Sequence, residues 1–219
     1  MQNGAQRYFI LHKPYDMVSQ FVSSHEVRVL GDLGYDFPEG THAVGRLDIN
    51  SEGLLILTTD KRVTRLLFQS KVPHRRTYLV KVKYAVSAES LERLCKGVTI
   101  RVRGGGYYVT APCEAEVIPE PVGVFGPAGS LGSAESLGSA GPFSPPGKDY
   151  FPVTWLRITL TEGKFHQLRK MVDAVGHRCM RLIRVSIEEL SLAGLAAGGV
   201  REVEQGPFFE QLNITFPPL

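Results

Sequence analysis

At 219 residues the chain can bury a substantial core, either as one domain with two lobes or as two small domains. With 43% hydrophobic and 21% charged residues it has the composition of a soluble globular protein, and no apolar run approaches the roughly 20 residues that a membrane helix needs. Three widely spaced cysteines argue against a disulfide framework, and the first residues lack the apolar stretch of a signal peptide, so we expect a cytoplasmic protein.

The small net charge of +3 conceals an uneven distribution of charge. Residues 157–184 hold seven lysines and arginines against two acidic residues, and residues 71–83 hold five basic residues and no acidic one. Two basic segments on such a chain indicate a localised surface for a polyanion. Two solvated faces without a common purpose would give the same pattern.

Hydrophobic periodicity predicts strands and helices in alternation along the first half of the chain. The run LLILT at 54–58 is typical of a strand buried on both faces, and residues 77–84 alternate like a strand with two different faces. Lys13-Pro14 is expected to turn the chain out of the first strand. We expect strands at 7–11, 54–58 and 77–84, a helix from a cap at Thr59 or Asp60 to about Ser70, and a helix from Ser87 to Gly97.

The second half contains one clear helix and one segment of unusual composition. Leu168, Met171, Val172 and Val175 recur at helical spacing, which predicts a helix from about Lys164 to Val175. Residues 122–148 are so rich in Gly, Ser, Ala and Pro that we interpret them as a mobile surface insertion. Further strands are expected at 98–103, 107–118 and 153–161, with short strands within 180–204. This mixture, without a regular βαβ repeat, indicates an α+β fold.

Common cofactor and metal motifs are absent from the sequence, so we expect no cofactor and no metal. What remains is Asp48, in a glycine-flanked loop just before the strand at 54–58. A carboxylate there could be held at a cleft, or it could form an Asx-turn that only shapes the loop. Together with Glu52 it could also form a carboxylate pair of the glycosidase kind.

Tyr78 and Arg169 can each be explained by a structural role as well as by a functional one. Tyr78 could be an aromatic core residue of an alternating strand. Arg169, at the border between the apolar and polar faces of its helix, could pair with Asp173 one turn later. The residues alone therefore describe a basic α+β protein and name no reaction.

Four ordered segments resemble motifs of the pseudouridine synthases that modify ribosomal RNA, in the branch that contains synthase A of the small ribosomal subunit and synthases B, E and F of the large one. HAVGRLDINSEGLLILTTD (42–60) is similar to the catalytic signature, FILHKPYDMVSQF (9–21) to the opening Lys-Pro motif, RRTYLVKV (75–82) to the tyrosine-bearing strand and EGKFHQLRKM (162–171) to the late arginine motif. The tail LSLAGLAAGGVREV (190–203) also matches, so the resemblance covers the chain apart from 122–148.

The resemblance implies an α+β fold with a mixed, mainly antiparallel sheet, flanking helices and two lobes around a catalytic cleft. Residues 1–219 would form a single catalytic domain. Many relatives carry a small RNA-binding domain before the Lys-Pro motif; here we expect none, in a layout most similar to that of the synthases of type E. Asn50, Leu168 and Lys170 depart mildly from the family pattern, which bears on the choice of uridine and not on the reaction.

The resemblance also implies site-specific isomerisation of uridine to pseudouridine in RNA, with ribosomal RNA as the expected substrate. Asp48 would act at the flipped nucleotide, Arg169 would pair with it and keep it ionised, and Tyr78 would stack on the uracil. Further substrate-binding candidates are Arg46 and His166 for the gap left by the flipped base, Leu182 for the pocket wall or, alternatively, the core, and Lys13, Arg75, Arg76, Lys164 and Lys170 for phosphates.

Two other function classes remain open. A non-catalytic RNA-binding or ribosome-assembly protein on the same fold would be expected to have lost Asp48, Tyr78 or Arg169, and all three are present. A nucleosidase that uses Asp48 and Glu52 would release free uracil. We expect the chain to act on RNA as a monomer, without a membrane partner.

Overall fold

The chain divides into two compact units, residues 1–74 with 184–219 and residues 75–183. The computed structural model describes residues 5–69, 72–121 and 151–215, so the insertion predicted at 122–148 lies outside the described residues. Within these three ranges no helix combines the length and the apolar character that crossing a bilayer requires.

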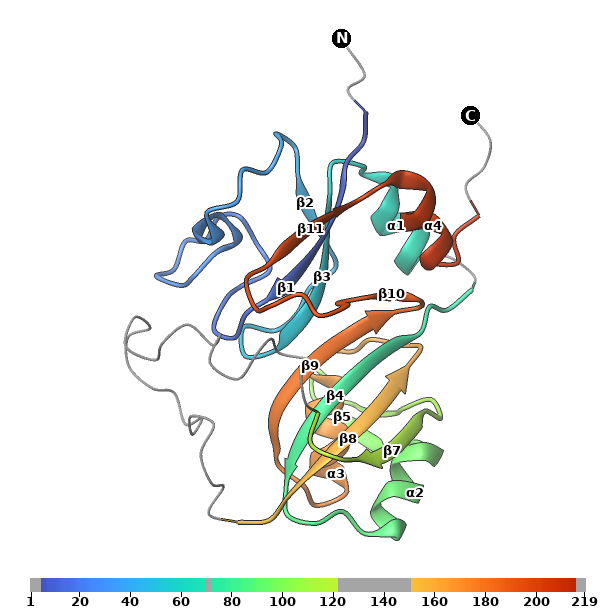
Figure 1. The fold of residues 1–219 in the computed structure, drawn as a ribbon. Coiled ribbons are helices and arrows are strands. Elements are labelled where there is room, and N and C mark those ends of the chain that lie inside the picture. Colours follow the sequence, from blue (N-terminus) through green and yellow to red (C-terminus); the bar gives the residue numbers. More distant parts are fainter. Residues whose placement is uncertain (1–4, 70–71, 122–150, 216–219) are drawn as a thin grey trace. The chain divides into compact units, whose positions relative to one another are not determined.

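In the first unit, the two ends of the chain share one antiparallel sheet. β1 pairs with β3 on one side and with β11 on the other, so ribbon from the start and the end of the sequence lies side by side in Figure 1. Every residue of β1 and β3 is buried, which explains the apolar runs Tyr8–Leu11 and Leu54–Leu57 within them. The elements of this unit are β1 (Tyr8–Lys13), a 3₁₀ turn (Leu30–Leu33), β2 (His42–Val44), β3 (Glu52–Thr58), α1 (Arg62–Phe68), β10 (Leu190–Ser191), β11 (Val200–Val203) and α4 (Gln205–Gln211).

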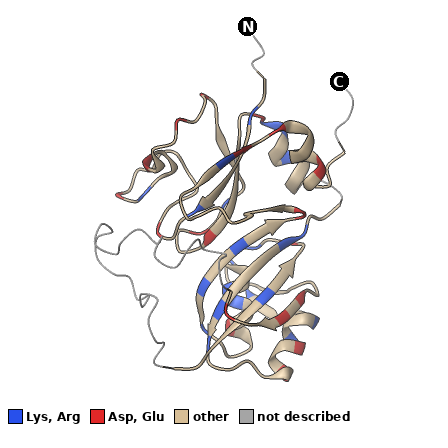
Figure 2. Ribbon diagram, in the orientation of Figure 1, with Lys and Arg blue, Asp and Glu red and all other residues tan. Residues whose placement is uncertain are grey.

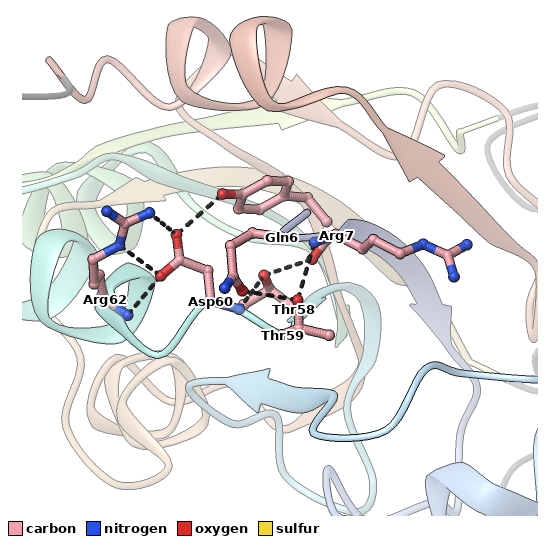
Figure 3. Close-up of polar contacts among 7 residues, drawn as sticks. Gln6, Arg7, Thr58, Thr59, Asp60 and Arg62 are labelled. Atoms are coloured by element: carbon pink, nitrogen blue, oxygen red, sulfur yellow. Dashed lines mark hydrogen bonds and ion pairs between the residues drawn. The ribbon is translucent and has the colours of Figure 1, made fainter. Parts of the chain in front are cut away.

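Asp60 is a buried carboxylate that joins α1 to β1. It accepts hydrogen bonds from the Tyr8 hydroxyl at 3.0 Å, from the backbone N–H of Arg62 at 3.0 Å, and from the Arg62 guanidinium at 2.9 and 2.8 Å (Figure 3). Burial raises the pKa of Asp60, but the bonds from Arg62 and Tyr8 outweigh it, so this pKa lies below its usual value. α1 begins at Arg62 with Lys61 before it, so the cap expected at Thr59 or Asp60 was placed one or two residues early, although Asp60 does accept the N–H of Arg62.

The second unit is an antiparallel sheet with two helices and a small hairpin. β8 lies between β4 and β7, β5 pairs with β6, and apolar residues of β4, β8 and α3 form a common core. β9 begins beside β4 in this unit and ends beside β3 in the first. The elements are β4 (Arg76–Lys83), α2 (Ala88–Lys96), β5 (Thr99–Arg101), β6 (Tyr107–Val109), β7 (Glu114–Ile118), β8 (Val153–Leu160), α3 (Gln167–Ala174) and β9 (Cys179–Ile187).

Most predicted elements are present, and the expected α+β class is confirmed. The Ser87 hydroxyl accepts the N–H of Ser90 at 3.1 Å, and Gly97 ends the helix, both as expected. The single strand predicted at 107–118 is wrong: it is two strands, separated around Pro112, which has no N–H to donate. α3 begins at Gln167, later than predicted, because His166 adopts the left-handed conformation, and α4 was not predicted.

Gly53→Ala should severely destabilise the first unit. Gly53 has φ +105°, and a Cβ there would lie 2.2 Å from the carbonyl oxygen of Arg184. We expect a loss of at least about 3 kcal/mol in the free energy of unfolding, measured by urea unfolding with circular dichroism. The control Gly34→Ala, at φ +67° with no atom within 4 Å of the added Cβ, should cost only about 1 kcal/mol. Equal losses in the two variants would contradict the close approach.

Candidate active site

Asp48 lies in the loop between β2 and β3, where the backbone on both sides of it is anchored. Leu47 is buried, and the Ser19 hydroxyl accepts its N–H and donates to its carbonyl oxygen, both at 3.0 Å. Asp48 itself accepts the N–H of Ser51 through its backbone carbonyl at 3.0 Å. The turn that carries Asp48 is thus closed by a main-chain hydrogen bond.

Lys13, at the end of β1, anchors the other side of this loop. Its side chain is fully buried, and its Nζ donates to the carbonyl oxygens of Pro14 at 2.8 Å, Met17 at 2.6 Å and Ile49 at 3.4 Å. The N–H of Met17 donates to the same Ile49 oxygen at 3.3 Å. The Lys-Pro segment therefore supports the residue that follows Asp48.

The ammonium of Lys13 is surrounded by carboxylates as well as carbonyls. Burial lowers the pKa of Lys13 to about 8, although the negative charges of Glu52, Asp48 and Asp16 act in the opposite direction. Since its three N–H donors are directed at backbone oxygens, none is left for an RNA phosphate. The burial of Lys13 therefore argues against the phosphate contact expected for it and favours a role in holding the loop.

Tyr78 and Leu182 both border the core of the second unit. Tyr78 lies on β4 opposite Ile158 of β8, and its partly exposed side chain packs against the buried cluster. Leu182 on β9 is a member of that cluster and is 6% exposed. Leu182 thus has the environment of a core residue, which was the alternative to a place in a pocket wall.

Arg169 projects from the first turn of α3, next to the buried stripe of that helix. Its neighbour Leu168 and also Met171 and Val172 are buried, which fixes the rotation of the helix. The Arg169 guanidinium donates to Sγ of Cys179 at 3.6 Å. Burial raises the pKa of the Cys179 thiol to about 11, although the charge of Arg169 acts in the opposite direction. Arg169 is half-buried, as its border position predicted.

The segment before α3 is held by one carboxylate. Glu162 accepts hydrogen bonds from the Tyr108 hydroxyl at 2.5 Å, the backbone N–H of Ala111 at 3.0 Å and the side-chain amide of Gln167 at 2.6 Å. Gln167 in turn accepts the N–H of Lys164 at 2.8 Å through its side-chain oxygen. These bonds fix the segment to the β5–β6 hairpin on one side and to α3 on the other.

The remaining residues predicted to contact RNA differ in their exposure. Arg75 is exposed and forms an ion pair with Glu114 at 2.6 Å, whereas Arg76 is 8% exposed and lies beside Gly163. That burial argues against a surface phosphate contact for Arg76. Other basic residues follow the strands of the second unit (Figure 2). The exposed or partly exposed candidates are Arg46, Arg75, Lys164, His166 and Lys170.

Comparison with known proteins identifies the family. A family model described as RNA pseudouridylate synthase matches residues 7–174, from the segment before β1 to the end of α3. The chain belongs to the RNA pseudouridylate synthase family. It is 32% identical over 201 residues to ribosomal large subunit pseudouridine synthase E of Vibrio parahaemolyticus. The matched region covers 91% of this chain and 74% of that protein. The Xanthomonas axonopodis pv. citri protein of the same name is 34% identical, covering 85% of this chain and 88% of its own length.

A solved structure supports the same fold. A crystal structure of a pseudouridylate synthase matches 95% of this chain and 74% of its own, with a TM-score of 0.69 at 23% identity. The predicted family and fold class are therefore confirmed, and the chain is an enzyme of a family that isomerises uridine in RNA. Asp48 belongs to the first unit, and Tyr78 and Arg169 to the second, so their roles in one site remain predictions.

Sequence reasoning missed the residues that support this family's motifs. Ser19 holds the backbone beside Asp48, Glu162 holds the segment before α3, and the contacts of Lys13 with backbone carbonyls were not foreseen. A signal existed for Lys13, because a lysine that directly follows an apolar strand and precedes proline is a candidate for burial. For Ser19 we find no comparable signal in the sequence.

Lys13→Met should change the pH dependence of stability. The unfolded lysine keeps its proton up to about pH 10.5, whereas folded Lys13 releases it near pH 8, so the unfolded chain binds more protons between these values. The wild type should therefore gain about 2 kcal/mol relative to the variant between pH 7 and pH 9.5, measured by urea unfolding. Lys61→Met, which removes an exposed lysine, is the control and should show no relative gain. Parallel pH profiles of wild type and Lys13→Met would refute the buried ammonium.

Proposed function

We propose that this enzyme converts uridine to pseudouridine at defined positions of ribosomal RNA, with Asp48 as the carboxylate that acts on the flipped nucleotide. The observation that carries the proposal is the anchored backbone on both sides of Asp48, within a segment matched by the family model. An anchored loop holds a reacting group in one orientation, which lowers the entropic part of the barrier. Ribosomal RNA is supported by the names of the similar proteins.

The proposed reaction rearranges the bonds of one nucleotide and involves no oxidation or reduction. The bond from ribose C1′ to uracil N1 breaks, the base turns, and a bond from C1′ to C5 forms, while C5 loses a proton and N1 gains one. An ionised Asp48 can attack the sugar or accept the C2′ proton, and both routes require a carboxylate. Tyr78 stacks on the uracil, and its hydroxyl can accept a proton in this mechanism.

Arg169 supplies the counter-charge to Asp48 in this proposal. A guanidinium can bind both oxygens of a carboxylate and favours its ionised form, which opposes the effect of desolvation. The packed stripe of α3 supports the role, since it fixes where Arg169 projects. Lys13 adds a second positive charge near Asp48 within the first unit.

The basic residues give the enzyme its affinity for RNA. Extracting a base from its stack costs a few kcal/mol, which contacts outside the target nucleotide must offset. Arg46 and His166 are the candidates to fill the gap, and Arg75, Lys164 and Lys170 the candidates for phosphates. We expect a monomeric enzyme in the cytoplasm, where ribosomal RNA is available.

Asp48→Asn should abolish isomerisation while folding and RNA binding persist. The amide preserves the shape of the side chain but offers neither an anionic nucleophile nor a base, so activity should fall by at least about 10³-fold. Chemical labelling of pseudouridine followed by primer extension on unmodified ribosomal RNA measures the product. Asp36→Asn, at an exposed loop position of the same unit, is the matched control and should remain active.

Two results of this experiment would overturn the proposal. Turnover by Asp48→Asn at the wild-type rate would remove the role of Asp48. Release of free uracil by the wild type, detected by chromatography, would instead indicate a nucleosidase that uses Asp48 with Glu52.

Arg169→Ala should lose activity by at least about 10²-fold, because Asp48 loses its counter-charge. The thermal unfolding midpoint should also fall, because a half-buried side chain that contacts Cys179 is removed. Arg178→Ala removes an exposed arginine of the same unit and should change neither quantity. Full activity of Arg169→Ala at an unchanged midpoint would mean that Arg169 is only a surface residue.

A further inference from the structure

An exposed aromatic residue, Phe165, precedes α3 and has no place in the mechanism above. Phe165 keeps 58% of its surface exposed although it is a large apolar side chain. Its ring stacks on that of His166, with centroids 3.8 Å apart and an angle of 18° between the planes. Lys170 extends from the first turn of α3, and its Nζ lies 5.3 Å from the centroid of Phe165.

The backbone that presents this pair is held in an uncommon conformation. His166 has φ 54° and ψ 31°, a left-handed conformation that L-residues other than glycine seldom adopt. Glu162 and Gln167 fix the segment on either side of the pair. Such strain persists only where the surrounding structure enforces it, and it is concentrated at functional sites. The exposed position of Phe165 is therefore a feature of a rigid segment.

Two lysines, Lys164 and Lys170, flank the aromatic pair in the sequence. Lys164 is exposed, and its Nζ lies 4.7 Å from the ring centroid of Tyr108. Lys164 directly precedes Phe165 in the sequence. Lys170 lies in the first turn of α3, with its Nζ close to the Phe165 ring. The nearest acidic residue in the sequence, Glu162, accepts three hydrogen bonds, and Asp173 is exposed two turns along α3 from Phe165.

We propose that Phe165, backed by His166, is a stacking platform for an unpaired base of the RNA near the target uridine, with Lys164 and Lys170 on the adjacent phosphates. An aromatic face flanked by cations matches a single-stranded nucleic acid, because each nucleotide offers a π face and a negative charge. The inference rests on the proposed function in that it names a contact of the same substrate. It assigns Phe165 to affinity and not to chemistry.

Phe165→Ala tests the platform, and Phe165→Trp and Tyr107→Ala are its controls. The probes are a fluorescein-labelled, mixed-sequence single-stranded RNA of about 12 nucleotides for binding and unmodified ribosomal RNA for turnover. Loss of one stacked base should raise Kd on the order of tenfold at fixed salt, and KM should rise while single-turnover kcat stays near the wild-type value. Phe165→Trp should restore the affinity. Tyr107, 77% exposed on β6, is an aromatic residue of the same unit whose removal should leave Kd unchanged.

Salt dependence separates stacking from charge. Phe165→Ala should leave the slope of log Kd against log salt unchanged, whereas Lys164→Gln should reduce it by about one phosphate contact. Unchanged Kd and KM in Phe165→Ala, beside an active wild type, overturn the platform and leave the proposed function intact. A wild type that makes no pseudouridine, while its RNA binding still depends on Phe165, supports the platform and overturns the proposed function.

Discussion

A single buried ammonium holds the loop of Asp48. Removing a lysine side chain from water costs several kcal/mol unless polar partners replace the water. Lys13 finds these partners in three carbonyl oxygens, one of which belongs to Ile49, directly after Asp48. A displacement of Ile49 would remove one hydrogen-bond acceptor from the buried ammonium, which is unfavourable. The contact therefore restrains the loop. The pairing of β1 with β3 sets this geometry, since Lys13 lies opposite Gly53 at the point where the loop enters β3.

In the second unit a charged side chain also holds backbone segments in place, but there it is a carboxylate and not an ammonium. There the Glu162 carboxylate collects three donors from the β5–β6 hairpin, the following turn and α3. In both units a charged side chain binds groups of at least one other segment, so one residue holds separate pieces of backbone together. Catalytic geometry on loops depends on such supports, because a loop has few ladder hydrogen bonds of its own.

The sequence predicts the strands and helices where one periodicity dominates. β3 and α3 were recognisable because their apolar residues follow one spacing, and Ser87 and Gly97 mark the ends of α2 by their own conformational preferences. The prediction of a single strand at 107–118 was wrong because apolar residues continue through the segment that separates β6 from β7. The start of α3 was misplaced because a left-handed histidine is imposed by tertiary contacts of Glu162 and Gln167, which no local pattern reveals. For Lys13 the preceding apolar strand and the following proline indicate burial, but they do not reveal its partner Ile49, which lies 36 residues away.

Two aspartates flank β3 within the same motif, and their surroundings differ. Both oxygens of Asp60 accept hydrogen bonds from Arg62 or Tyr8, so this carboxylate is committed to joining a helix to a strand. At Asp48 the main chain closes the turn, and the neighbouring residues are held by Ser19 and Lys13. The backbone around Asp48 therefore has supports of its own in Ser19 and Lys13, whereas the Asp60 side chain is itself the support at the start of α1. An anchored loop holds a side chain in one orientation, and this is the physical argument for proposing Asp48 and not Asp60 as the reacting carboxylate.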